Sequence, residues 1–290
     1  MLRRLVRNPL ALLGLVLVLG FVAVAVAAPY ISPPRYPHEP YRIARLGWTI
    51  EPRPPSPRAP LGTTEGQYDL LHGIVWGARS AFSMAVAVVA ANLTIGILLG
   101  TLAGYYGGAL DELLMRVTDV FMAFPILLAG FVLATLIGKG LRTVFVTLVA
   151  FGWMQYARLM RAGVLQTRAM EYVEAARAMG MPTTRILLRY ILPNCIYPVL
   201  VQASLDLGSV VVFAATFSFL GIGADPGYAD WGQLIAFSRN WILGRPGQPL
   251  AYWHTVVLPG AAILLFVLGW NLLGDGLRDA MDPRLRHLRK

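Results

Sequence analysis

The chain has 290 residues, of which 57% are hydrophobic and only 14% charged, and its mean hydropathy is +0.60. These values exclude an ordinary soluble globular domain and predict an all-α integral membrane protein. The formal net charge is +10. The basic residues flank apolar stretches and do not form a patch with interleaved aromatic residues, so the charge does not indicate nucleic-acid binding.

About six transmembrane helices are expected, because a span needs about 20 predominantly apolar residues. The candidate stretches are residues 10–28, 81–105, 120–138, 141–160, 197–221 and 255–273. The uncharged core of the fourth stretch, residues 143–157, is short and includes Gln155. Tilt or local thinning of the bilayer would have to accommodate it.

The basic residues predict the orientation of these spans. If the N-terminus is cytoplasmic, most of the 25 basic residues fall on the inside, whereas the short outer loops carry only Lys139, Arg142, Arg239 and Arg245. The remaining outer basic residues lie in the long segment 29–80, where the positive-inside bias is weaker. Both termini are therefore expected to be cytoplasmic.

Residues 1–28 are expected to form the N-terminal transmembrane helix. Arg3, Arg4 and Arg7, followed by an apolar run that ends in Ala25-Val26-Ala27, also fit a cleavable signal peptide. The uncharged run is long for the core of a signal peptide, and the remaining topology is the same in both cases. The single cysteine, Cys195, excludes a disulfide within the chain.

Segment 29–80 is predicted to be an external Pro-rich loop followed by an interfacial segment. The dense prolines between positions 29 and 60 remove backbone donors and favour an extended chain. Helical spacing returns after residue 61. Leu70, Ile74 and Trp76 are then expected to lie on a membrane surface or on a neighbouring subunit.

Segment 81–286 is predicted to be the membrane-embedded core. Gly96, Gly100 and Gly104 recur at every fourth position and form a smooth stripe suited to close helix contact. A structural connector with polar residues at positions 111, 112, 116 and 119 follows and ends in a kink at Pro125. Segment 221–244 is predicted to be an external loop and an interfacial helix, anchored by Trp231 and Trp241.

Segment 171–193 is a charged helix-forming island between two stretches that are apolar enough to cross a bilayer. Residues 171–179 contain strong helix formers, and Gly180 supplies a C-terminal stop. Pro182 cannot continue the same helix. A second helix over residues 184–190 is expected, with Thr183 as its cap. The simplest alternative is a solvated interfacial helix.

The order Glu174-Ala175-Ala176, Gly180 and then Leu192-Pro193 resembles the EAA motif of permease subunits in bacterial ABC importers. The resemblance implies a type I ABC importer permease architecture, with cytoplasmic coupling helices between spans 4 and 5 that dock on an ATPase. The residues that it assigns to ATPase coupling are Glu174, Ala175, Ala176, Arg177, Gly180 and Arg185. Tyr190 departs from the common pattern, which has an aliphatic residue there.

Asp206 is the one acidic residue inside a predicted span, where an uncompensated charge costs several kcal/mol. It therefore marks a face that meets protein or water. Helical spacing places Gln202, Ser209 and Phe213 on the same face, and the four residues are candidates for lining the path of a polar substrate. The alternative is that Asp206 is protonated, or paired with a partner subunit, and serves only helix packing.

No catalytic, metal or cofactor site is expected in this chain. Lys139, the only lysine before the C-terminus, lacks the glycine spacing of a Walker A loop. The histidines at positions 38, 72, 254 and 287 are too scattered for a metal cluster. The chain is therefore not expected to be an enzyme, and ATP and Mg²⁺ would belong to partner subunits.

From about residue 61 to 286 the chain resembles the second permease subunit of peptide-type ABC importers. The C-terminal sequence NLLGDGLRDAMDPRLR, residues 271–286, carries part of this resemblance, and acids and arginines in it are expected to pair with one another. Residues 287–290 form a short tail. The resemblance implies a heterodimer with a second homologous permease, two cytoplasmic ATP-binding subunits and an extracytoplasmic solute-binding protein.

The implied setting is the bacterial plasma (inner) membrane, surrounded by lipid, with di- or oligopeptides as substrate. Within the same family the substrate could instead be a nickel chelate, glutathione or an oligosaccharide. A function of a different class is an ATP-independent secondary transporter that uses Asp206. The lack of other acids within the predicted spans, and of inverted repeats with broken helices, weakens this alternative.

Overall fold

The structure is a computed structural model that describes residues 8–281. Over this range the regular secondary structure is helical, and the only β-type pairing consists of isolated bridges. The elements in chain order are α2 (Pro9–Ile31), η1 (Glu65–Gln67), α3 (Leu70–Tyr106), α4 (Gly108–Ala123), α5 (Ile126–Ile137), α6 (Leu141–Ala150), α7 (Trp153–Arg168), α8 (Glu171–Ala178), α9 (Thr183–Ile186), η2 (Leu187–Ile191), α10 (Leu192–Phe219), α11 (Trp231–Ala236) and α12 (Trp253–Met281).

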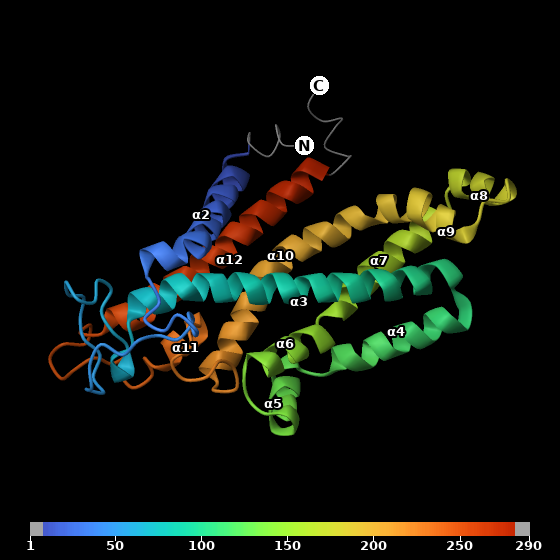
Figure 1. Cartoon of the computed structure of the whole chain (residues 1–290). Helices are drawn as coiled ribbons and strands as arrows, with labels where there is room; N and C mark the ends of the chain where they lie inside the picture. Colours follow the sequence, from blue (N-terminus) through green and yellow to red (C-terminus); the bar gives the residue numbers. More distant parts are fainter. Residues whose placement is uncertain (1–7, 282–290) are drawn as a thin grey trace.

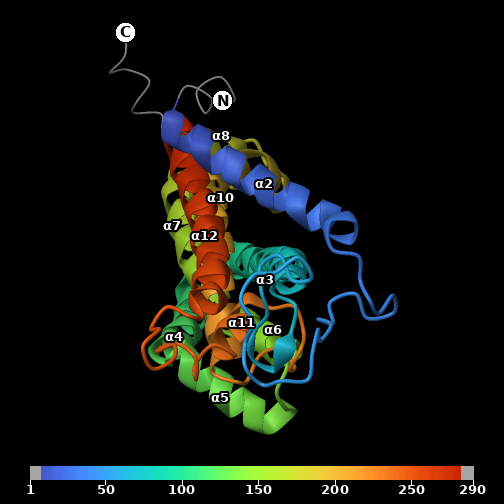
Figure 2. The ribbon, with the colours of Figure 1, turned by 90° about the vertical axis from the view of Figure 1, so that its left-hand side faces the viewer.

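The helices form an elongated bundle with two different ends (Figure 1). The long helix α3 runs through its length, and α10 and α7 cross it. α11 and the irregular segments gather at one end, called here the loop end. The short helices α8 and α9 project at the opposite end, called the α8 end (Figure 1). Figure 2 shows α2 and α12 along one side of the bundle.

Four helices in the described range are long and apolar enough to cross a membrane: α2, α3, the continuous helix Thr183–Phe219 and α12. The pair α4 and α5 adds a fifth span if it is counted as one, although the two helices meet at a bend of 87°. The expected count of six spans is not confirmed. The predicted third and fourth spans are both broken.

The breaks have local causes. The third span, 120–138, breaks at Phe124, which is extended, and at Pro125, which lacks a backbone donor. The fourth breaks at Gly152, between α6 and α7. There the Asn92 side chain of α3 donates to the Leu148 carbonyl over 3.3 Å, and it occupies the space where a Cβ on Gly152 would lie. This side chain takes the carbonyl that the next helical N–H would have used.

Glycines bring the backbones of α3 and α7 together, as the sequence predicts. A Cβ added to Gly96 would lie 2.2 Å from the Tyr156 Cβ, and one added to Gly100 would lie 2.4 Å from the Ala157 carbonyl oxygen. Gly104 lies against Val164 in the same way. The predicted packing role of this glycine stripe is confirmed.

A similar contact joins the beginning of α2 to the end of α12. A Cβ on Gly14 would lie 2.6 Å from the Leu273 backbone nitrogen. The two ends of the described chain therefore lie side by side. Some of the residues discussed above lie outside the described range: Arg3, Arg4 and Arg7 at the N-terminus, and the part of the expected C-terminal ion pairs that falls in residues 282–290. Within the described range, no ion pair joins Arg278 to Asp275 or Asp279.

Segment 61–80 differs from the expectation of a free interfacial segment. Asp69 caps α3 by accepting a hydrogen bond from the Leu71 N–H over 3.0 Å, so the helix begins at Leu70. Leu70 and Trp76 are buried within the chain. The Trp76 indole N–H donates to the Ser32 carbonyl over 2.9 Å, which ties the first turns of α3 to the end of α2.

The segments at the loop end pack on one another. The Ile43 N–H donates to the Gly227 carbonyl over 2.7 Å, and the Tyr41 and Tyr228 rings stack with centroids 5.3 Å apart. Trp231, predicted as a membrane anchor, is instead buried and donates to the Ile74 carbonyl of α3. Trp241 donates to the Glu65 carboxylate over 2.7 Å. The loop end is therefore an ordered cap on the bundle.

The close contact between α3 and α7 predicts that Gly100→Ala destabilises the fold. The added methyl group meets backbone and the Met160 Cβ, which cannot move independently of α7, so we expect a loss of about 1–3 kcal/mol, typical of overpacking. The measurement is the thermal unfolding midpoint of the purified protein in detergent. Gly20→Ala in α2 is the control, because its Cβ would meet nothing within 4 Å. Equal midpoints for both variants would contradict the close approach.

Candidate functional site

The turn between α8 and α9 depends on Gly180. This residue has φ +75°, a conformation that costs other L-residues about 1–2 kcal/mol. Its N–H donates to the Arg177 carbonyl over 2.9 Å, and the Met181 N–H donates to the Ala176 carbonyl over 3.2 Å. These two bonds form a Schellman motif. The predicted glycine stop is confirmed, whereas Thr183 lies inside α9 and makes no capping bond.

The helix pair α8–α9 has one buried and one exposed face. Val173, Ala176 and Ile186 are buried in the hydrophobic core. The remaining residues predicted to couple to an ATPase are exposed: Glu174, Ala175, Arg177, Gly180 and Arg185. Ala176 therefore supports the exposed face from below and does not belong to it.

Three aromatic residues hold this helix pair on the bundle. The Arg177 guanidinium lies 5.4 Å from the centroid of the Tyr105 ring, at the end of α3. The Tyr172 and Tyr190 rings lie 6.5 Å apart, and Asn194 donates to the Tyr190 carbonyl over 2.6 Å. Tyr190, which departs from the family pattern, thus has a packing partner within this chain.

The chain continues from α9 into α10 without a break. Residues Thr183–Phe219 form one continuous helix, in which η2 is a π-helical turn. The ring of Pro193 would clash with the carbonyl four residues before it, and the wider π turn absorbs this conflict. A displacement of α9 is therefore transmitted along the helix axis to α10.

Ion pairs attach α4 to α7 near the α8 end. The Arg161 guanidinium donates two hydrogen bonds to Asp111, over 2.5 and 2.6 Å, and Arg158 pairs with Asp119. Arg168 donates to the last carbonyls of α3 over 2.9 Å and so complements the negative end of that helix dipole. The polar connector predicted around Asp111 and Asp119 is thus a structural clamp. Its arginine partners were not predicted.

Asp206 lies on a face of α10 that the rest of the chain covers only in part. Its carboxylate accepts a hydrogen bond from the Gln202 amide over 2.9 Å and faces the hydroxyl of Tyr156 on α7. The Tyr156 side chain is fully buried, and its hydroxyl makes no hydrogen bond to any of the described residues. Ser209 and Phe213 are exposed farther along the same face. Sequence reasoning missed Tyr156, whose only signal is its position opposite Gly96.

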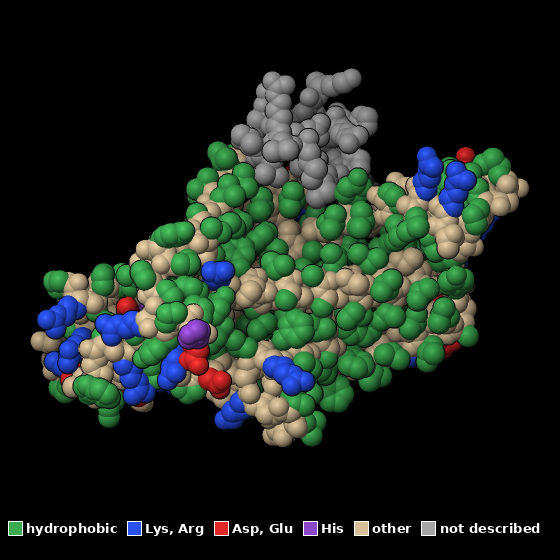
Figure 3. Space-filling model, in the orientation of Figure 1, with side chains coloured by type: hydrophobic (Ala, Val, Ile, Leu, Met, Phe, Trp, Pro, Cys, Tyr) green, Lys and Arg blue, Asp and Glu red, His purple; other side chains and the backbone are tan. Residues whose placement is uncertain are grey.

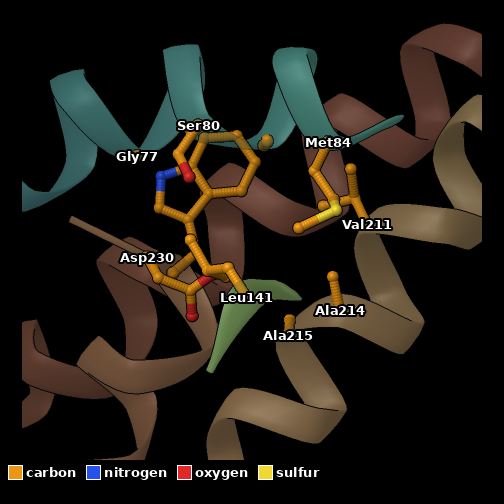
Figure 4. A pocket seen from close by; sticks show the side chains of 10 residues that line it. Gly77, Ser80, Met84, Leu141, Val211, Ala214, Ala215 and Asp230 are labelled. Atoms are coloured by element: carbon orange, nitrogen blue, oxygen red, sulfur yellow. The ribbon is translucent and has the colours of Figure 1, made fainter. Parts of the chain in front are cut away.

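A small cavity of about 20 Å³ lies where α3, α10 and α11 meet (Figure 4). The Ser80 hydroxyl and the Asp230 carboxylate are polar groups in an otherwise mostly apolar lining (Figure 4). Removal from water raises the pKa of Asp230, although a hydrogen bond from the Gln233 N–H opposes this shift. The cavity has room for about one water molecule, so it is not a substrate path.

The matches to known families cover most of the chain. Residues 96–287 match the family described as the inner membrane component of binding-protein-dependent transport systems. The chain belongs to this permease family. Residues 1–47 also match the N-terminal transmembrane domain of oligopeptide transport permease C.

Named relatives support the same assignment. The permease is 34% identical to the dipeptide transport system permease protein DppC of Alkalihalophilus pseudofirmus, over 98% of this chain and 89% of the relative. It is 38% identical to the di/tripeptide transport system permease protein DppC of Pseudomonas aeruginosa, over 97% and 90%. It is 33% identical to the oligopeptide transport system permease protein OppC of Bacillus subtilis, over 96% and 87%.

A solved structure shares the fold. A chain of the inward-facing MetNI methionine ABC transporter superposes with a TM-score of 0.55 at 20% identity, and the match covers 72% of the permease and 96% of that chain. The fold is therefore that of an ABC importer permease. The helix pair α8–α9 contains residues 174–180, whose order resembles the EAA motif.

Because Gly180 has a positive φ, substitutions at this position are expected to weaken the turn to different extents. In Gly180→Ala we expect the turn to weaken by about 1–2 kcal/mol, and in Gly180→Asn by less, because asparagine tolerates this backbone conformation. The measurement is amide hydrogen exchange of residues 171–181 in the purified permease, which should accelerate most in the alanine variant. Unchanged exchange in both variants would mean that the turn does not depend on glycine.

Proposed function

We propose that this permease is a subunit of an ATP-driven importer of dipeptides and oligopeptides and forms half of the translocation pore. The names of the relatives, which concern dipeptide, di/tripeptide and oligopeptide transport, support this substrate class. A relative from Pectobacterium atrosepticum, 36% identical, is named as a glutathione transport permease. Glutathione is itself a small peptide and is therefore a second candidate substrate.

Energy coupling is assigned to the exposed face of α8–α9. The observation that carries this proposal is the unbroken helix Thr183–Phe219, whose first turn lies in the exposed helix pair and whose remainder crosses the bundle. Two cytoplasmic ATP-binding subunits, which hold ATP and Mg²⁺, would bind this face. Their closure on ATP would pull α9 and thereby tilt or shift α10.

A second, homologous permease would cover the open face of α10. Asp206 and Gln202 are only half-buried by this chain, and Ser209 and Phe213 are exposed. A carboxylate facing lipid would be costly, so this face requires protein or water beside it. A water-filled path between two such faces satisfies this requirement and gives Asp206 access to the charged ends of a peptide.

The orientation of the permease in the membrane follows from the assignment of ATPase binding to α8–α9. The α8 end would face the cytoplasm, together with both termini, and the loop end would face outward from the bacterial inner membrane. An extracytoplasmic solute-binding protein would deliver the peptide to the loop end. An ATP-independent transporter remains the alternative of another class, but it leaves the exposed α8–α9 face without a purpose.

Peptide uptake into liposomes that contain the co-purified assembly tests this function. We expect uptake to require ATP and to fall at least about tenfold in Glu174→Arg, which reverses a charge on the exposed face. Gly180→Pro should have a similar effect, because proline cannot adopt a positive φ. Glu112→Arg is the matched control, an exposed site on α4 at which the same change should leave uptake intact.

Two outcomes would contradict the proposal. Uptake by wild type without ATP-binding subunits would exclude an ATP-driven importer. Unchanged uptake in both Glu174→Arg and Gly180→Pro, with the assembly intact, would exclude energy coupling through α8–α9.

Asp206→Asn tests the transport path. A charged hydrogen-bonding group is worth about 1.5–3 kcal/mol, so we expect its loss to slow uptake about tenfold or more while the assembly still forms. Size-exclusion chromatography checks assembly, and Ser204→Ala, a buried change on another face of α10 beside Gly274, is the control. Normal uptake by Asp206→Asn would leave Asp206 with a packing role only.

A further inference from the structure

The loop end contains a large hollow to which no residue role has yet been assigned. It has a volume of about 980 Å³ and opens between the loop before η1 and the turn before α11. Its lining includes four arginines and no acidic residue: Arg35, Arg42, Arg45 and Arg58. We call this hollow the arginine groove. Figure 3 shows basic side chains gathered over this end of the molecule.

Backbone hydrogen bonds fix the walls of the arginine groove. The Leu46 N–H donates to the Gln67 carbonyl over 2.8 Å, and the Asp69 N–H donates to the Ala44 carbonyl over 3.1 Å. The Arg45 guanidinium donates to the Tyr68 hydroxyl over 2.8 Å and lies 4.8 Å from the centroid of that ring. The groove is thus preorganised, which lowers the cost of ordering it on binding.

The positive charge of the groove is largely uncompensated. Arg42 pairs with Glu39 over 2.9 Å, but this pair is solvent-exposed and therefore weak. Arg45 contacts the neutral Tyr68 ring. Within residues 8–281, no carboxylate lies within ion-pair distance of Arg35 or Arg58. An anionic surface entering the groove would meet four guanidinium groups, of which Arg42 and Arg45 are held by contacts within the chain.

Exposed aromatic residues line the same groove. Trp48 is 98% exposed and Tyr36 is 43% exposed, although both belong to a loop that is held by backbone hydrogen bonds. Tryptophan, tyrosine and arginine are the residues that most often dominate the free energy of protein–protein binding. A fully exposed tryptophan beside arginines that have no ion-pair partner among the described residues, Arg35 and Arg58, therefore indicates a docking surface.

We propose that the arginine groove docks an acidic, protruding patch of the soluble solute-binding protein. This inference rests on the proposed function for its orientation, since it requires the loop end to face outward. A concave hollow suits a protrusion on a folded protein better than it suits the flat surface of a lipid bilayer. The groove would steer an acidic partner electrostatically, and Trp48 would be buried at the contact.

The test measures the affinity of the solute-binding protein for the whole assembly in liposomes. The probe is the purified binding protein that supports peptide uptake by wild type. In Arg35→Glu combined with Arg58→Glu we expect the Kd to rise about tenfold or more, and its dependence on salt to weaken. Trp48→Ala, which cannot disturb the core because the side chain is exposed, should raise the Kd while the salt dependence stays.

Arg142→Glu, a surface change outside the groove, is the matched control and should leave the Kd unchanged. A saturating concentration of binding protein should restore uptake in the groove variants, because only docking is weakened. A Kd unchanged in all groove variants would overturn the proposal. A loss of affinity that appears with phosphatidylglycerol but not with phosphatidylcholine would also overturn it, in favour of a lipid headgroup site.

These experiments distinguish a failure of the proposed function from a failure of the groove proposal alone. If no binding protein supports ATP-dependent uptake by wild type, the importer function and the groove proposal fall together. If wild type takes up peptide and the groove variants bind the delivering protein normally, only the groove proposal falls.

Discussion

The close approach of α3 and α7 is the constraint on which the rest of the structure depends. Three glycines at every fourth position, beginning at Gly96, let the two backbones touch, and no side chain larger than hydrogen fits there without moving α7. This contact sets Tyr156 opposite Asp206, brings Arg168 to the end of α3 and places Tyr105 beneath α8. The α8–α9 surface and the open face of α10 are therefore positioned by one helix pair.

The structure also explains how a small surface can act at a distance. The turn at Gly180 is closed by two backbone hydrogen bonds, and the buried residues Val173 and Ile186 fix the helix pair to the bundle. From α9 the helix runs without interruption past Asp206. Because packed helices shift as units and do not deform continuously, a force on the exposed face must move the residues along α10.

Much of this arrangement could be predicted from residue spacing, because glycine periodicity and a glycine stop followed by proline are local signals. The apolar stretches predicted the helical fold but not the number of spans. The break at Gly152 depends on the Asn92 side chain, which is distant in sequence, and the burial of Trp231 depends on its contact with α3. The Asp206 face was predicted from periodicity, whereas the buried Tyr156 beside it became visible only after α7 was placed.

The most direct test of the account is a cross-linking measurement on single-cysteine variants in a Cys195→Ser background. Met179 lies on the exposed part of the α8–α9 turn, and Trp48 lies at the loop end. In the intact assembly, a cysteine at position 179 should cross-link to an ATP-binding subunit, with a yield that changes when ATP is bound. A cysteine at position 48 should give no such product. A cross-link to the ATP-binding subunit from position 48, or none from position 179, would contradict the assignment of energy coupling to α8–α9.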